Sequence, residues 1–240
     1  MGRSLIVIPA HLDSKRLPGK VLLECGRRTL LEHTYRQALQ CYHFADVVVA
    51  TSDDTIAGVV RAFNGICVHT SGVDFPNGTS RAFAAYEWVR DQWDCRHYQS
   101  VIVWQADEPC IDPADVYKLA KPNQAYAINT LVATVTADTD IQDTNTVKAI
   151  LISEDTPVQR VVWFTRHPLI YAFIHVGIYS FYVGSIPKLK ELEVHQYAED
   201  ESLEQLTWLA NNWSVGATQI KSHAPLSINT QDDWDRFTQQ

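Results

Sequence analysis

A cluster of positive charges follows the first hydrophobic run of the sequence. Lys15, Arg16 and Lys20 lie in one loop, and Pro18-Gly19 places a turn between the last two. Such a loop can present backbone N–H groups and cationic side chains to a polyphosphate. An ordinary solvated basic loop has the same composition, so the charges alone leave both interpretations open.

A carboxylate follows another hydrophobic run. Asp107 comes just after Val101–Trp104 and begins the sequence Asp107-Glu108-Pro109. An oxygen ligand at the end of a buried strand suits Mg²⁺, which also binds substrate phosphates. The same residues are ordinary turn formers, so Asp107 is either a metal ligand or the start of a turn.

A third polar segment, Asn77-Gly78-Thr79, opens a predicted helix. The first N–H groups of a helix have no partner within it and can receive anionic or carbonyl groups. The alternative interpretation is a plain N-terminal cap, for which Asn77 is a suitable residue.

These segments need a parallel sheet to bring them together. Continuous apolar runs at Leu5–Ile8, Val47–Ala50 and Val101–Trp104 are typical of strands buried on both faces. Helical periodicity separates them, with helices expected from Thr29, from about Ile56 and from Gly78 to about Trp93. Because ligands in open α/β sheets bind beyond the carboxyl ends of the strands, we expect the chemistry at that edge.

The pattern changes after a short helix that follows Pro113. We expect short strands at 125–136, 146–152, 158–164 and 176–183, which favour an antiparallel or mixed sheet, and then helices at about 200–212 and 231–240. The predicted fold is an α/β, Rossmann-like sandwich with a mainly parallel sheet and a smaller mixed part. We expect one domain over 1–240, made of two halves, 1–122 and 123–240.

Composition excludes several classes of protein. The net charge of −8 argues against non-specific nucleic-acid binding. No apolar run approaches the roughly 18 residues of a membrane span, so we expect no membrane insertion. The five cysteines form no CxxC pair, which favours reduced thiols and a cytoplasmic location.

The segment Ser14-Lys15-Arg16-Leu17-Pro18-Gly19-Lys20 resembles the CTP-binding signature of the CMP-sugar synthetases, above all the CMP-KDO synthetases (3-deoxy-manno-octulosonate cytidylyltransferases). The segment Gln105-Ala106-Asp107-Glu108-Pro109 resembles that family's Gln-Gly-Asp-Glu-Pro. Further matches follow in the same order at 145–148, 164–166, 175–179 and 201–206. The resemblance implies a nucleotidyltransferase in which the anomeric hydroxyl of KDO attacks the α-phosphate of CTP, giving CMP-KDO and diphosphate with Mg²⁺ as cofactor.

The resemblance also implies that 1–122 is the mainly nucleotide-binding half and 123–240 the mainly sugar-acid-binding half, and it implies roles for individual residues. Catalysis would rest on Lys20, Arg16 and Asp107. The nucleotide would be bound by Ala10, Ser14, Arg16, Lys20, Thr51, Asn77, Gly78, Thr79, Arg81 and Gln105. The sugar acid would be bound by Arg166, His175, Tyr179, Glu201, Glu204 and Gln205. Magnesium would be bound by Asp107 and Asn229, and the protein is expected to be a homodimer acting on CTP and a small acidic sugar.

The sequence departs from the family at four charged positions. Ser52 replaces an Asp and Ala198 replaces a Glu, and the other two are His11 and Asn229. His11 stands where the family has Arg, and Asn229 stands where it has the second Asp on magnesium. The stretch between Arg166 and His175 is also shorter than in the family. These departures leave two alternatives open: the same chemistry on another acceptor (a related sugar acid, an amino-sugar analogue or a phosphonate), or a degenerate protein that only binds nucleotide or sugar.

Overall fold

A computed structural model describes residues 2–70, 75–93, 97–120, 125–136, 139–152, 156–221 and 223–239. The chain divides into two compact units, one formed by Met1–Ala120 with Leu226–Gln240 and the other by Lys121–Pro225. The expected boundary at 122/123 lies outside the described residues. The end of the chain, which we expected to go with the second half, belongs to the first unit instead.

The first unit contains a four-stranded parallel sheet in the order β5-β4-β1-β6. The expected apolar runs form its strands, and Leu5 to Ile8 in the centre are fully buried. The sheet places the carboxyl ends of β1 and β6 at one edge, as predicted. The strands are β1 (Arg3–Pro9), β4 (Ala45–Thr51), β5 (Cys67–His69) and β6 (Tyr98–Trp104).

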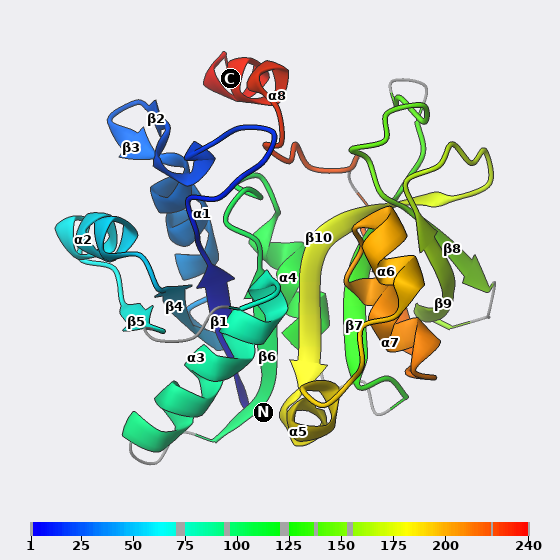
Figure 1. The fold of residues 1–240 in the computed structure, drawn as a ribbon, viewed down its shortest axis with the longest axis horizontal. Coiled ribbons are helices and arrows are strands. Elements are labelled where there is room, and N and C mark those ends of the chain that lie inside the picture. Colours follow the sequence, from blue (N-terminus) through cyan, green and yellow to red (C-terminus); the bar gives the residue numbers. More distant parts are fainter. Residues whose placement is uncertain are drawn as a thin grey trace. The chain divides into compact units, whose positions relative to one another are not determined.

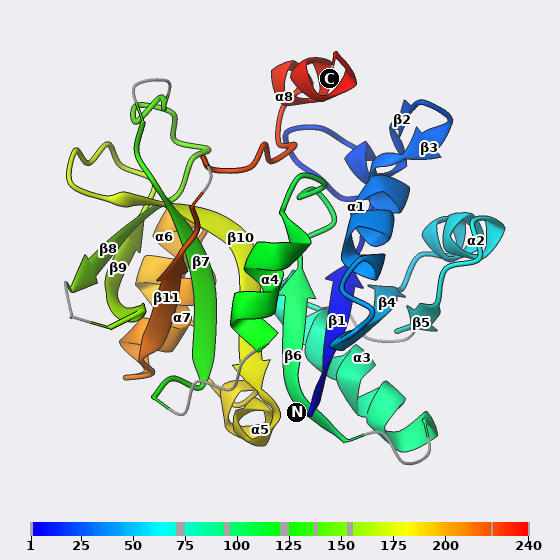
Figure 2. The same ribbon diagram turned by 180° about the vertical axis from the view of Figure 1, so that it is seen from behind.

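Helices cover both faces of this sheet: α3 packs on one face, and α1 and α4 lie on the other (Figures 1 and 2). Side chains that precede the helices cap them, because Thr29, Asp53 and Asn77 each accept a hydrogen bond from a backbone N–H of the first turn. The first unit also contains η1 (Lys20–Leu22), the short strands β2 (Glu24–Cys25) and β3 (Arg28–Thr29), α1 (Leu30–Leu39), α2 (Asp54–Ala62), α3 (Gly78–Gln92), α4 (Pro113–Ala120) and α8 (Gln231–Thr238).

The second unit contains a mixed sheet in the order β10-β7-β11-β9-β8. β7 pairs antiparallel with β10 and parallel with β11, whereas β9 pairs antiparallel with both β11 and β8. The predicted mixed part is therefore confirmed. The strands are β7 (Ile128–Thr134), β8 (Lys148–Ile152), β9 (Val158–Thr165), β10 (Phe173–Tyr182) and β11 (Val215–Gln219), the last of which was not predicted.

The prediction of one continuous helix at about 200–212 is wrong. The chain instead forms two helices, because Ser202 takes a left-handed conformation (φ 51°) and Leu203 N–H bonds back to Ala198 O. This turn buries Leu203 and ends the first helix at Glu201. The helices of the second unit are η2 (Val183–Ser185), α5 (Ile186–Leu189), α6 (Gln196–Glu201) and α7 (Gln205–Ala210).

Within the described parts of the chain, none of the helices has the length and apolar character needed to cross a membrane.

Candidate active site

Lys20 lies at the centre of the candidate site. Its ammonium donates to Asp107 Oδ2 at 2.5 Å and to Ile228 O at 2.8 Å, and it lies 3.4 Å from Asn229 Oδ1. The preceding Gly19 has φ 66°, a conformation that glycine adopts without strain. Its N–H bonds to Leu12 O, so the loop folds back on itself and directs Lys20 inward.

Asp107 is held by its own backbone. It follows β6, and its carbonyl oxygen accepts a hydrogen bond from Ile228 N at 2.9 Å. The preceding carbonyl, of Ala106, accepts from Thr34 Oγ1 at 2.8 Å. Both bonds fix the backbone from which the carboxylate projects, and that side chain is 22% exposed. Asp107 is therefore both fixed and accessible to a ligand.

Asn229 comes from a segment that we call the C-terminal strap, residues 226–230. Ile228 anchors the strap in a core cluster with Leu30 and Trp234. The Asn229 amide oxygen accepts from Arg16 Nη2 at 2.7 Å, and its Nδ2 donates to Ser227 Oγ. The strap thus places an amide oxygen beside both Lys20 and Arg16.

The start of α8 holds the strap in place. Thr230 and Asp233 form a reciprocal capping box, and the Asp233 carboxylate also accepts from Asn229 N. Burial of Asp233 raises its pKa, but the hydrogen bonds from Thr230 and Asn229 and the contact with Arg236 outweigh this and hold that pKa below the ordinary value. Asp233 is therefore committed to the cap of α8 and to holding the backbone of the strap.

The first turn of α3 lies against the same edge of the sheet. A Cβ added to Gly78 would lie 3.0 Å from Pro9 and 3.2 Å from the side-chain oxygen of Gln105, so glycine permits this close approach. Arg81 is 7% exposed, donates to Ala10 O at 3.2 Å and lies over the Phe75 ring. Ala10, Gly78, Arg81 and Gln105 therefore meet at one edge, as the sequence predicted.

The other residues expected to bind nucleotide have local roles in the structure. Thr51 is fully buried and accepts from Asp53 N, and Asn77 accepts from Ser80 N as the cap of α3. Thr79 is 4% exposed. Ser14 N–H bonds to Leu12 O within the loop that leads to Lys20. Their backbone and side-chain positions shape the edge, and direct contact with nucleotide remains a prediction for each.

His11 lies at the entrance of the basic loop and is exposed. The pKa of its imidazole is lowered below 6.5. Partial burial of the ring is the largest cause and the positive charge of Arg81 is the second, whereas Asp13 acts in the opposite direction. His11 is therefore neutral at pH 7, and the fixed charge of the family's Arg is absent at this position.

Arg166, expected to contact the sugar acid, holds two turns together in the second unit. Its guanidinium lies within 3.5 Å of the carbonyl oxygens of Thr144, Asn145, Glu201 and Ser202. The Glu201 carboxylate accepts from Thr165 Oγ1 and from Arg166 N, both at 3.0 Å. Both side chains position backbone here, and a direct contact of either with substrate remains a prediction.

His175 and Tyr179 lie in an aromatic cluster of the second unit. Their rings stack at 5.1 Å, and Tyr179 packs edge-on against Trp208. Thr130 donates its hydroxyl to Ile178 O at 2.7 Å, so it accepts from His175 Nε2 at 3.0 Å. Burial, with a smaller effect of Arg166, lowers the pKa of His175 to about 3, so the imidazole is neutral.

The last two expected sugar contacts lie at the start of α7. Glu204 precedes this helix and is partly buried, and Gln205 is 4% exposed.

Lys148, which contacts Arg166, was not assigned to the site from the sequence. Lys148 is fully buried, and its ammonium donates to Asp143 O at 2.7 Å and Arg166 O at 3.2 Å. The signal was its place in the matched segment 145–148, which we had used only for the resemblance.

Cys41, Cys67 and Cys110 are poorly suited to act as nucleophiles. Cys25, Cys41, Cys67 and Cys110 are not in disulfides, and Cys95 lies outside the described residues. Burial raises the pKa of Cys41 to about 12 and also raises the pKa values of Cys67 and Cys110. These thiols are therefore protonated at neutral pH.

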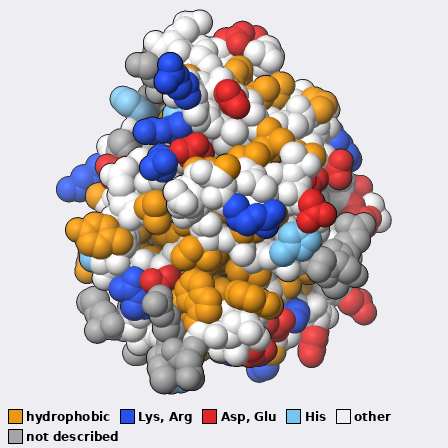
Figure 3. Space-filling model, turned by 90° about the vertical axis from the view of Figure 1, so that its left-hand side faces the viewer, with side chains coloured by type: hydrophobic (Ala, Val, Ile, Leu, Met, Phe, Trp, Pro, Cys, Tyr) orange, Lys and Arg blue, Asp and Glu red, His pale blue; other side chains and the backbone are white. Residues whose placement is uncertain are grey.

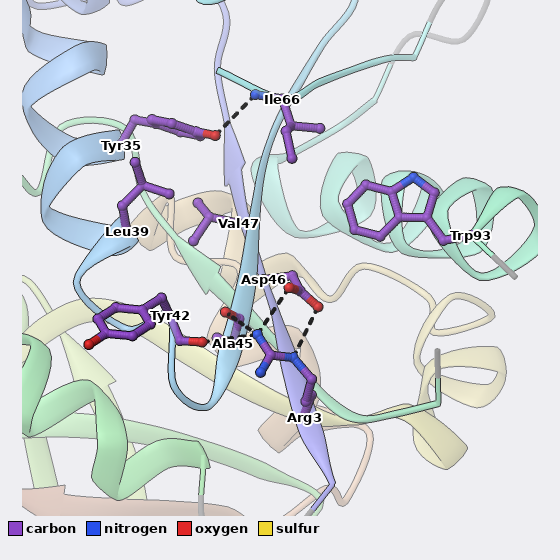
Figure 4. A pocket seen from close by; sticks show the side chains of 9 residues that line it. All are labelled: Arg3, Tyr35, Leu39, Tyr42, Ala45, Asp46, Val47, Ile66 and Trp93. Carbon is purple, nitrogen blue, oxygen red and sulfur yellow. Dashed lines mark hydrogen bonds and ion pairs between the residues drawn. The ribbon is translucent and has the colours of Figure 1, made fainter. Parts of the chain in front are cut away.

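A groove of about 500 Å³ lies elsewhere in the first unit (Figure 4). It is lined by residues such as Tyr35, Leu39, Ile66 and Trp93. Its two charged residues pair with each other, because Arg3 donates hydrogen bonds of 3.0 and 3.2 Å to the Asp46 carboxylate. Hydrophobic side chains also gather in the lower half of the face shown in Figure 3. Arg3 begins β1, whereas Lys20 and Asp107 lie beyond the carboxyl ends, so the groove is separate from the site.

The oxygens around Lys20 fit the donor chemistry of magnesium. A carboxylate, an amide and a backbone carbonyl lie around one ammonium, and Mg²⁺ prefers oxygen ligands. Only the Asp107 carboxylate carries a charge, and among the described residues no group of three or more His, Cys, Asp or Glu side chains could hold a metal ion. Magnesium bound here would therefore depend on oxygen ligands from a substrate.

Comparisons with known proteins identify the family of the chain. The sequence profile described as "Cytidylyltransferase" matches residues 5–220. The 3-deoxy-manno-octulosonate cytidylyltransferase of Bartonella henselae is 31% identical over 97% of this chain and 96% of that protein. The protein of the same name from Escherichia coli is 30% identical over 94% of this chain and 91% of its own length.

A solved structure of CMP:2-keto-3-deoxy-manno-octonic acid synthetase in complex with CTP has the same fold. It superimposes with a TM-score of 0.84 and 28% identity, covering 99% of this chain and 98% of that one. The family match spans most of the chain and includes the basic loop and Asp107. The chain belongs to the cytidylyltransferase family.

Proposed function

We propose that this protein transfers CMP from CTP to the anomeric hydroxyl of 3-deoxy-manno-octulosonate, releasing diphosphate. The observation that supports the proposal most strongly is the convergence of Arg16, Lys20, Asp107 and Asn229 at the carboxyl edge of a parallel sheet. Two cations beside a carboxylate match the needs of a triphosphate and its metal ion. The acceptor comes from the names of the relatives, which align along nearly the whole chain.

The reaction would be an in-line displacement at the α-phosphorus. The sugar hydroxyl gives up its proton to solvent water as its oxygen forms a new P–O bond, the bond to the bridging oxygen breaks, and diphosphate leaves with that electron pair. Arg16 and Lys20 would donate to the phosphate oxygens and stabilise the charge that grows on the leaving group. Magnesium on Asp107 and Asn229 would supply further charge neutralisation and polarise the phosphate.

The residues of the second unit would determine the acceptor. Arg166 and Glu201 tie together the turns at 144–145 and 201–202, and the nearby His175 is neutral because its pKa is lowered. We propose that these turns bind the sugar acid, with Tyr179, Glu204 and Gln205 completing that part of the site. A homodimer and a cytoplasmic location are further proposals, both drawn from the resemblance to the family.

The test is diphosphate release from CTP, Mg²⁺ and KDO by the purified protein. Release that needs both substrates and is lost in Asp107→Ala would support the proposal, and Asp54→Ala is the matched control because its side chain is 98% exposed. Release only with another sugar acid, an amino-sugar analogue or a phosphonate would change the acceptor and keep the chemistry. CTP binding without release with any acceptor would indicate a degenerate binding protein, the alternative suggested by Asn229 and His11.

A further inference from the structure

Lys20 occupies the position that a bound cation would take. Its ammonium lies among Asp107 Oδ2 at 2.5 Å, Ile228 O at 2.8 Å and Asn229 Oδ1 at 3.4 Å. These are three oxygens of three different kinds, and they come from two segments that are far apart in the sequence, the end of β6 and the C-terminal strap. An ammonium with three donors matches three acceptors, so the lysine satisfies a site whose oxygens also suit a hard divalent cation.

The oxygens are fixed independently of Lys20. Ile228 N–H bonds to Asp107 O, which ties the strap to the end of β6, and Ile228 itself is fully buried. Asn229 is held from its backbone by Asp233 and from its side chain by Ser227 and Arg16. Lys20, by contrast, is a flexible four-carbon chain that reaches the oxygens from a loop. When the contacts change, the lysine is the member that can move.

A divalent cation and Lys20 compete for the same carboxylate. The ion pair uses one oxygen of Asp107, and the Lys20 side chain is 11% exposed, so the pair is poorly screened by water. Arg16 adds a second positive charge at Asn229. Both charges repel a metal ion that approaches the protein alone, and only one of the three oxygens carries a negative charge to oppose them.

A triphosphate reverses this balance. Its oxygens are stronger acceptors for an ammonium than a backbone carbonyl or an amide. The loop containing Lys20 is also the one that resembles the family's CTP-binding signature. A nucleotide bound to this loop therefore attracts Lys20 away from Asp107, while it brings negative charge and oxygen ligands for a metal.

We propose that Lys20 is a tethered cation that keeps divalent metal off Asp107 until the nucleotide binds, so that metal and nucleotide enter the site together. The inference rests on the proposed function for the identity of the nucleotide, and on the geometry alone for the masking of Asp107. It assigns Lys20 two successive partners: the carboxylate in the free protein and the triphosphate afterwards.

The test measures Mn²⁺ binding to the protein without nucleotide, by electron paramagnetic resonance of the unbound ion. In Lys20→Met, whose side chain has similar length and no charge, we expect Mn²⁺ to bind about tenfold or more tightly than in the wild type, because Asp107 is unmasked. Lys15→Met, in the same loop, is the matched control and should bind as the wild type does. The double variant Lys20→Met, Asp107→Asn should lose the gain.

A second measurement uses the wild-type protein and does not depend on the folding of a variant. The NMR signal of the Asp107 carboxyl carbon should resist paramagnetic broadening when Mn²⁺ is added alone, and should broaden once CTP is also present. Wild-type protein that binds Mn²⁺ at Asp107 as tightly as Lys20→Met, or broadening without CTP, would overturn the inference. The Mn²⁺ measurements made without nucleotide contain no substrate. Their outcome is therefore independent of whether the protein releases diphosphate.

Discussion

The amide oxygen of Asn229 accepts a hydrogen bond from Arg16 at 2.7 Å and lies 3.4 Å from the ammonium of Lys20. These residues are separated by 213 and 209 positions in the sequence, and the C-terminal strap brings them together. Because Asn229 is a neutral amide, it attracts Arg16 and Lys20 only through its dipole, whereas a carboxylate would attract them with a full negative charge. The consequences for metal and nucleotide binding can be measured.

Replacing Asn229 with Asp should lower the Mg²⁺ concentration needed for half-maximal diphosphate release at saturating CTP. A second carboxylate adds charge to a site that now has one, so we expect a shift of about tenfold. Gln239→Glu adds the same charge at the exposed end of the chain and should leave the requirement unchanged. A requirement that stays the same or rises in Asn229→Asp would show that this position does not face the metal.

Replacing Arg16 with Gln should weaken CTP binding. The guanidinium would lose its charge-assisted contacts with the phosphates, and we expect the KM for CTP to rise by about tenfold to a hundredfold. The comparison is Lys15→Gln, which removes a charge from the neighbouring position. Equal effects of the two variants would mean that the loop acts by net charge and that Arg16 has no specific contact.

Replacing Asp233 with Ala should destabilise the first unit by about 1–3 kcal/mol, because it removes the capping box and leaves the N–H groups of Asn229 and Thr230 without that acceptor. Denaturant unfolding measures this free energy. Asp232→Ala, on the exposed side of the same turn, should change it by less than about 0.5 kcal/mol. Asp233→Ala should also raise the KM for CTP, since the strap positions Asn229, and an unchanged KM would contradict that role.

His175 should make the protein less stable as the pH falls. Its pKa in the folded protein is about 3, below the ordinary 6.5, so between these values the unfolded chain binds more protons than the folded one. The contribution of His175 to the free energy of unfolding is complete above pH 6.5 and decreases as the pH falls toward 3. In His175→Gln the decrease should be shallower by up to about 1.4 kcal/mol per pH unit, with His223→Gln, an exposed site, as control. Parallel stability curves for wild type and His175→Gln would show that this histidine titrates normally.

The sequence predicted the parallel part of the fold well because its strands are continuous apolar runs. Leu5–Ile8 and Val47–Ala50 have no competing helical pattern, and both are buried strands. β11 was missed because Val215-Gly216-Ala217-Thr218-Gln219 is short, contains a glycine and has no long apolar run. Its place in the sheet is set by pairing with β7 and β9. The break at Ser202 was missed because a left-handed serine has no signature in the sequence.

The sequence suggested members for the candidate site but not the contacts among them. The resemblance pointed to Lys20, Asp107 and Asn229 separately, yet the ion pair between the first two joins residues 87 positions apart. Only tertiary structure brings them together. The same holds for Arg166, whose bonds to backbone carbonyls of two distant turns could not be inferred from its place after Phe164-Thr165.

The mass of the product formed from CTP, Mg²⁺ and KDO identifies both the transferred group and its acceptor. We expect one new species, CMP joined to the sugar acid, formed by the wild type and Asp54→Asn and reduced about a hundredfold or more in Asp107→Asn. Product formed equally well by Asp107→Asn, or CTP left intact in the presence of every acceptor, would contradict this expectation.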